Sequence, residues 1–141
     1  MEEGPVRHTL GYTVIADFVA DIERAIDSSG IVLSSKIEKY FGPAEKSVYV
    51  TSHLTMIDSS LLEVAIFAIE SAATLAIVKY RFHYMDSKGQ TVFRYDNAPH
   101  HPELLSFPHH KHTPNRTTAS DMPSLDGVLS EISAAILTRH L

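Results

Sequence analysis

Apolar residues recur at helical spacing near both ends of the chain. Within residues 13–28 they are Ile15, Phe18, Val19, Ile22, Ala25 and Ile26. Residues 125–137 repeat the spacing, and charged or small polar residues fill the positions between the apolar ones in both stretches. A stripe of this kind buries one face of a helix and leaves the other in water. The pattern therefore predicts an N-terminal and a C-terminal amphipathic helix.

Between these two stretches the pattern predicts strands. Residues 31–41 alternate weakly and predict an edge strand, and four further strands are predicted at residues 47–56, 61–69, 75–85 and 91–96. The connections between the four are too short for a crossover helix, so neighbouring strands must pair antiparallel. The predicted fold class is α+β, with a four- to five-stranded antiparallel β-meander packed against the two helices.

The length of 141 residues suits a single domain, 1–141, with one core of its own. Residues 97–124 hold five of the seven prolines and show no periodic apolar pattern, which predicts a long irregular loop, a class of segment that usually has a function. The chain has no cysteine, which excludes disulfides and thiolate metal sites and suits a reducing compartment. With neither an export signal nor a membrane span in view, we expect a cytoplasmic protein that does not enter a membrane.

Strand 75–85 separates basic from aromatic side chains. Lys79, Arg81 and His83 alternate onto one face, and the other face receives Val78, Tyr80, Phe82 and Tyr84. The sequence does not fix the register of this strand against strand 91–96. Pairing of Asp86 with Gln90 would set Arg81 and His83 opposite Tyr95 and Phe93, whereas a slip of one residue would gather Arg81, His83 and Arg94 on one surface.

The formal net charge of −5 conceals an uneven distribution. Residues 79–116 hold six Lys or Arg against three Asp or Glu, a balance of +3, together with six of the nine histidines. Electrostatic attraction in salt solution acts over short distances, so a local basic region can bind a phosphate backbone even on an acidic protein. Nucleic acid is therefore not excluded as a partner.

Five histidines fall within 13 residues of the segment 94–112, and prolines lie beside them. They are His100, His101, His109, His110 and His112. Imidazoles can exchange protons with an RNA 2′-hydroxyl while nearby cations neutralise the phosphate. They can also act with Asp96 as ligands for Zn²⁺, Ni²⁺ or Fe²⁺. They can equally be ordinary hydrogen-bonded groups, and composition alone does not decide among these uses.

Several short strings resemble a known family. They are Tyr80-Arg81-Phe82-His83-Tyr84, the turn with Asp86 and Gly89, the run from Phe93 to Pro102, and the run from Phe107 to His112. In order and spacing these strings are similar to the core of the TumE toxins of type II toxin–antitoxin systems, most specifically over residues 79–112. The resemblance implies a toxin with a small antiparallel sheet and a cognate antitoxin that carries a helix-turn-helix DNA-binding domain. By analogy with other small α+β toxins, it also implies activity against RNA.

The first functional hypothesis is a metal-independent ribonuclease in which the catalytic residues are Arg81, Arg94, His100, His101, His109, His110, Lys111 and His112. The two arginines bind phosphate, His100 or His101 acts as base, one of the later histidines acts as acid, and Lys111 stabilises the oxyanion. The residues expected to contact substrate are His83, Tyr84, Tyr95, Asp96 and Asn97. Tyr84 and Tyr95 would stack on a base.

Two further hypotheses remain beside it. One is a metal-binding domain, a metalloenzyme or sensor, that holds zinc or another divalent transition metal through His100, His101, His109, His110, His112 and Asp96. The other is a non-catalytic interaction module. We expect no cofactor under the first hypothesis, an antitoxin as partner, RNA as a further partner, and a chain that can form homo-oligomers.

Overall fold

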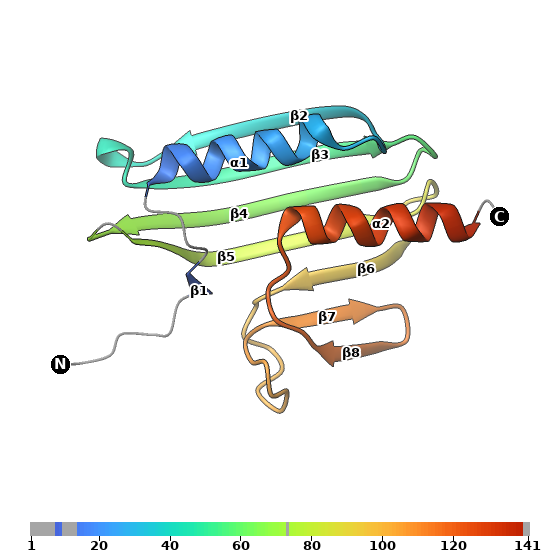
Figure 1. The fold of residues 1–141 in the computed structure, drawn as a ribbon. Helices are drawn as coiled ribbons and strands as arrows, with labels where there is room; N and C mark the ends of the chain where they lie inside the picture. Colours follow the sequence, from blue (N-terminus) through green and yellow to red (C-terminus); the bar gives the residue numbers. More distant parts are fainter. Residues whose placement is uncertain (1–7, 10–13, 73, 140–141) are drawn as a thin grey trace.

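The computed structural model describes residues 8–9, 14–72 and 74–139. Seven antiparallel strands form one sheet and follow each other in chain order (Figure 1). They are β2 (Val32–Phe41), β3 (Ser47–Met56), β4 (Leu61–Ser71), β5 (Thr74–Met85), β6 (Thr91–Asp96), β7 (His110–Thr113) and β8 (Arg116–Ala119). A short strand, β1 (His8–Thr9), pairs with β5, and a 3₁₀ turn, η1 (Pro43–Glu45), joins β2 to β3.

Two helices, α1 (Ile15–Ser28) and α2 (Leu125–Arg139), cover the same face of the sheet (Figure 1). The apolar positions of both helical patterns are buried there against alternate strand residues, such as Val64 and Phe82. The strand residues between these buried ones point to the opposite face, which we call the open face. Most of them are partly or fully exposed, whereas Asp96 and His110 on the same face are buried. This α+β arrangement confirms the predicted fold class. Among the described residues, no helix is long and apolar enough to cross a membrane.

The strand count is larger than predicted because residues 97–124 are not irregular throughout. They contain the hairpin of β7 and β8, which extends the meander beyond β6. Each of the two strands has only four residues, and neither shows the alternation of apolar and polar residues that marks a half-buried strand. Polar strands at the edge of a sheet leave no hydrophobic signal in a sequence.

The register of β6 against β5 follows from a bulge beside their turn. Asp86 N donates a 2.9 Å hydrogen bond to Gln90 O, but the pairing shifts between Tyr84 and Met85. His83 consequently lies opposite Arg94. Of the two registers that the sequence allowed, the structure has the one that gathers the basic side chains on the open face.

The prediction that Val78 shares a face with Tyr80 is wrong, because β5 has a second bulge at Val78. The register of β5 against β4 shifts between Phe67 and Ala68, which pair with Lys79 and Ile77. Val78 is the additional residue and is 39% exposed, outside the core where strict alternation would place it. Alternation resumes beyond it, so Lys79 and Arg81 point toward the open face as predicted.

Candidate functional site

Strands β5, β6 and β7 bring several of the predicted site residues together on the open face in two cross-strand rows. One row runs from Arg81 through Asp96 to His110, and the other from His83 through Arg94 to His112. Directly paired residues on one face of antiparallel strands lie close enough for their side chains to interact. The sheet therefore holds two of the clustered histidines next to a carboxylate and a guanidinium.

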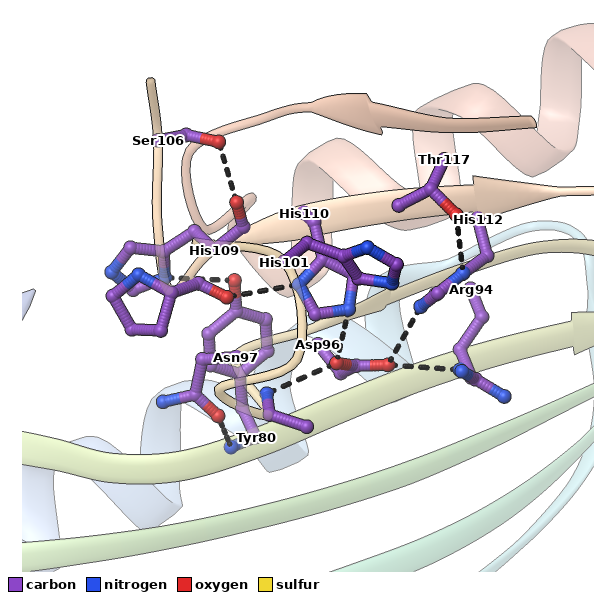
Figure 2. A network of polar contacts seen from close by, with 12 residues as sticks. Tyr80, Arg94, Asp96, Asn97, His101, Ser106, His109, His110, His112 and Thr117 are labelled. Carbon is purple, nitrogen blue, oxygen red and sulfur yellow. Dashed lines mark hydrogen bonds and ion pairs between the residues drawn. The ribbon is translucent and has the colours of Figure 1, made fainter. Parts of the chain in front are cut away.

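Asp96 lies at the centre of this group, and its side chain is 8% exposed (Figure 2). Its Oδ2 accepts a 2.8 Å hydrogen bond from Arg94 Nε, and its Oδ1 accepts one of 3.1 Å from Ala98 N. His110 Nε2 lies 2.7 Å from Oδ1, and His112 Nε2 lies 3.7 Å from Oδ2. The carboxylate thus joins β6, β7 and the beginning of the 97–109 loop.

His110 is enclosed, with 1% of its side chain exposed. Its Nδ1 lies 2.9 Å from the carbonyl oxygen of Pro108, so this nitrogen donates to that oxygen. Its Nε2 makes no hydrogen bond within the described part of the chain, although Asp96 Oδ1 is near. A buried nitrogen without an aligned partner costs free energy, on the order of 1–3 kcal/mol, unless something else satisfies it.

His101 and His112 complete the group and reach solvent, with side chains 31% and 23% exposed. His101 belongs to the 97–109 loop, and its ring centroid lies 5.1 Å from that of His110 and 5.6 Å from that of His112. His101 Nδ1 lies 3.2 Å from Glu103 Oε1, and His112 Nδ1 lies 3.0 Å from Thr117 Oγ1. We call His101, His110, His112, Asp96 and Arg94 the Asp96 cluster.

Two histidines of the open face, His112 and His83, have a lowered pKa. Burial, followed by Arg94 and His110, lowers the pKa of His112, and Asp96 opposes the shift. Burial also lowers the pKa of His83, whose Nε2 lies 2.7 Å from Thr91 Oγ1. A neutral imidazole has a lone pair available to accept a proton or to bind a metal.

Three residues expected in the site lie on the helix side of the sheet instead. Lys111 alternates with His110 and His112 along β7, so its ammonium points away from them and lies 2.9 Å from Glu131 Oε2 of α2. Tyr95 also donates a hydrogen bond to Glu131. This placement corrects the expectation that Lys111 lies beside the histidines.

Tyr84 is likewise in the core. It is fully buried, and its hydroxyl donates a 2.8 Å hydrogen bond to Ser60 Oγ. A ring enclosed in this way offers no face to a substrate base. The expected stacking role of Tyr84 and Tyr95 is therefore corrected as well, because strand alternation turns both rings toward the helices.

The remaining predicted residues are near the cluster but outside it. His109 stacks on Tyr80 with ring centroids 5.7 Å apart, and its Nδ1 lies 3.0 Å from the Tyr80 hydroxyl. His100 is exposed and is not part of the group of three imidazoles. Asn97 Oδ1 accepts a hydrogen bond from Tyr80 N (Figure 2), and its Nδ2 donates to Val78 O, so Asn97 is bound to the β5 backbone.

Sequence reasoning missed an aromatic row on the open face. Tyr40, Tyr49 and Phe67 are cross-strand neighbours, and Lys79 follows them on β5. The rings of Tyr40 and Tyr49 stack with centroids 6.3 Å apart. Alternation along each predicted strand could have assigned these residues to the solvent side, but their alignment requires the registers of four strands.

Comparison with known proteins gives one positive finding. The family model described as "Toxin TumE" matches residues 22–140, a range that includes the cluster and both helices except the beginning of α1. Neither the curated proteins nor the solved structures contain a match to the chain.

Proposed function

The chain belongs to the TumE toxin family and has a toxin role, and from this premise we propose that it acts on RNA and breaks phosphodiester bonds at the Asp96 cluster. The observation that carries the proposal is the convergence of three imidazoles, a buried carboxylate and a guanidinium on the open face. Groups of these types promote phosphodiester cleavage by moving protons and by neutralising the phosphate.

The residues that would bind phosphate are the accessible cations of the open face. The side chain of Arg94 is 38% exposed, and its Nε is bound to Asp96. No described residue binds its two terminal nitrogens, which can therefore hold a phosphate. Arg81 and Lys79 are exposed on the neighbouring strand, and neither forms an ion pair with any described residue. A chain of phosphates could therefore follow β5 toward the cluster.

The aromatic row supports a single-stranded substrate. A groove on the open face is lined by Tyr49, Ala65, Phe67, Lys79, Tyr80 and Arg81. Bases stack on exposed aromatic rings with little sequence preference, while adjacent cations hold the backbone. In this proposal Tyr40, Tyr49 and Phe67 take the stacking role first assigned to Tyr84 and Tyr95.

The reaction we propose is transesterification. The ribose 2′-oxygen attacks the adjacent phosphorus, its proton passes to a basic group of the cluster, the bond to the 5′-oxygen breaks, and that oxygen takes up a proton. The products are a 2′,3′-cyclic phosphate and a 5′-hydroxyl end. The solvent side of the cluster, formed by His101 and His112, is the place for these transfers, because enclosed His110 cannot touch a substrate.

The test uses the purified full chain and a synthetic RNA with one 2′-deoxy position at each mapped cleavage site. We expect the all-ribose RNA to be cut with cyclic phosphate ends and each 2′-deoxy position to resist. His112→Ala, purified in parallel to control for contaminating nucleases, should cut at least about 100-fold more slowly. Intact RNA in the presence and in the absence of EDTA or added Zn²⁺ would contradict the proposal.

A toxin family implies an antitoxin partner in general. We propose that the cognate antitoxin carries a helix-turn-helix DNA-binding domain and lays an acidic segment over the cations of residues 79–116, which complementary charge would favour. Bound there, it would exclude RNA. A co-purified complex should fail to bind RNA, and Arg81→Glu should weaken the complex without unfolding the toxin. RNA binding that persists in the complex would contradict this surface.

A further inference from the structure

The three rings of the cluster are all anchored in the same way. Nδ1 of His110 lies 2.9 Å from a carbonyl oxygen, Nδ1 of His112 lies 3.0 Å from a hydroxyl, and Nδ1 of His101 lies 3.2 Å from a carboxylate. This leaves Nε2 of each ring for a ligand. Histidines that bind metals almost always donate their other ring N–H to a carboxylate, a carbonyl or a similar acceptor, which fixes the ring and its tautomer.

The three rings also bring nitrogens close together. One ring nitrogen from each of His101, His110 and His112 lies within 4.8 Å of the other two. The rings meet edge to face, with interplanar angles of 68°, 66° and 87°, so they do not stack on each other. Figure 2 shows them grouped above the Asp96 carboxylate.

A second observation points to a ligand at this place. His110 Nε2 is buried, lacks a hydrogen-bond partner among the described residues, and is directed into the cluster. If His110 served only the fold, an aligned bond to Asp96 would satisfy it, yet at 2.7 Å the two atoms are near without such alignment. A cation on Nε2 would satisfy both the lone pair and the carboxylate.

We propose that His101, His110 and His112 bind one divalent transition metal ion of the Zn²⁺ type through their Nε2 atoms, with Asp96 as a neighbouring oxygen ligand. Tetrahedral Zn²⁺ with bonds of about 2.0–2.1 Å holds its ligand atoms about 3.3 Å apart. Nitrogens of the three rings now lie within 4.8 Å of one another, so bringing the ligand atoms to this separation requires only small movements of the side chains. His101 supplies most of them because it belongs to a loop.

The ligand set decides the class of metal. Three imidazole nitrogens and one carboxylate suit Zn²⁺, Co²⁺ or Fe²⁺, whereas Mg²⁺ and Ca²⁺ prefer ligands that are all oxygen. His101 and His112 are partly exposed, so water can reach the ion. Water would enter as a fifth ligand beside the four protein ligands, and water bound to zinc in catalytic sites ionises near pH 7.

A metal at this place deepens the proposed function, and only its catalytic role rests on that function. The ion would polarise the scissile phosphate and supply a bound hydroxide that takes the 2′-hydroxyl proton. The imidazoles would then be ligands instead of proton carriers, in place of the metal-independent mechanism expected from the sequence. Metal binding itself can be measured without RNA.

The experiment titrates the chelator-stripped full chain with Zn²⁺ in a calorimeter and with Co²⁺ by visible absorption. We expect one ion per chain, an absorption band typical of four- or five-coordinate Co²⁺, and no displacement by millimolar Mg²⁺ or Ca²⁺. His101→Ala and His112→Ala should each lower the affinity for Zn²⁺ more than about 100-fold, and Thr117→Val, which removes the acceptor for Nδ1 of His112, by about 10-fold or more. Circular dichroism checks that each variant is folded.

His53→Ala is the matched control, because His53 lies on the same open face and is 64% exposed but is not part of the cluster. It should bind Zn²⁺ as the unaltered chain does. Failure to bind Zn²⁺, or equal affinity in the unaltered chain and His112→Ala, would overturn the site even if RNA is cut. One ion bound through these histidines without RNA cleavage would support the site and contradict the proposed function.

Discussion

Asp96 is a buried carboxylate surrounded by a guanidinium, a backbone N–H and two imidazoles. It accepts from Arg94 Nε and Ala98 N and lies near the Nε2 atoms of His110 and His112. A carboxylate in such surroundings holds several chain segments in one geometry, because each partner would be left unsatisfied without it. The same group that stabilises the fold therefore also shapes the candidate site.

Asp96→Asn should show both effects. Replacing the charge by an amide weakens the bond to Arg94, and we expect the free energy of unfolding to fall by about 2 kcal/mol. RNA cleavage should fall as well. Urea unfolding measures the first effect, and exposed Asp27→Asn is the control, expected to stay within about 0.5 kcal/mol of the unaltered chain. Unchanged stability in Asp96→Asn would contradict the central position of this carboxylate.

Lys111 lies on the helix-covered face of the sheet and Arg81 on the open face, so variants of these two residues test the faces separately. Lys111→Ala removes the bond to Glu131 and the contact with the Tyr95 ring, so we expect a loss of about 1 kcal/mol in stability and no loss of RNA binding. Arg81→Ala should have the opposite result, with weaker RNA binding and unaltered stability. Unfolding and RNA-binding titrations on both variants test this, and weaker RNA binding in Lys111→Ala would contradict the assignment of faces.

For single residues, the sequence predicted that histidines form the site but not which of the histidines come together. Five histidines stood out, yet His109 pairs with Tyr80 and His100 is not in the group. Which of them meet depends on β7 pairing with β6, and β7 gave no hydrophobic signal. Glu103 and Thr117, which anchor two of the rings, are ordinary polar residues in the sequence.

Among the elements, α2 is fixed to the sheet through its last turn. Arg139 donates to Asp58 Oδ2 at 2.7 Å and to the Tyr84 hydroxyl at 2.6 Å, and thus joins the end of the helix to the β3–β4 turn and to β5. Burial would raise the pKa of Asp58, but hydrogen bonds from Ser60 and Arg139 outweigh it, so its pKa is lowered.

This shift predicts a dependence of stability on pH. Because the pKa of Asp58 is lower in the folded than in the unfolded chain, its contribution is complete above the unfolded value and is lost as pH falls through the folded one. The unaltered chain should therefore be more stable than Asp58→Asn at pH 7, and the difference should shrink below about pH 5. Urea unfolding across this range measures it, and a constant difference would contradict the shift.

Elements with apolar periodicity could be predicted, and the polar ones could not. Both helices and strands β3 to β6 follow their patterns, since one face of each is buried in the core. Strand β2 follows its weaker pattern at the edge of the sheet and has no fully buried residue. The β7–β8 hairpin and the two bulges of β5 depend on backbone pairing and leave no apolar trace. These unpredicted features fix the register of Arg81, His83 and Arg94, and with it the geometry of the site.

For the whole molecule, two helices on one face leave the other face of the sheet free to bind. The aromatic row and the cations of β5 lie beside the Asp96 cluster on that face. Charge and hydrophobicity averaged over the chain conceal this surface, because the acidic residues that make the net charge negative lie mostly outside residues 79–116. Only the arrangement of strands shows that the features are adjacent.

Binding of single-stranded RNA should therefore depend on salt and on the aromatic row. Each phosphate contact contributes about −0.7 to the slope of log affinity against log salt, so Lys79→Ala with Arg81→Ala should reduce the slope by about 1.4. Phe67→Ala should weaken binding by about 1–3 kcal/mol without changing the slope. Titrations at several salt concentrations measure both, and an unchanged slope in the double variant would exclude these two cations as phosphate contacts.

The most direct measurement compares two neighbouring histidines in living cells. His101 belongs to the cluster, and His100 is exposed beside it in the same loop. When the toxin is induced without its antitoxin, His100→Ala should arrest growth and leave RNA fragments with cyclic phosphate ends, as the unaltered chain does, whereas His101→Ala should do neither at equal protein level. Growth arrest and RNA fragments that persist in His101→Ala would contradict the Asp96 cluster as the toxic centre.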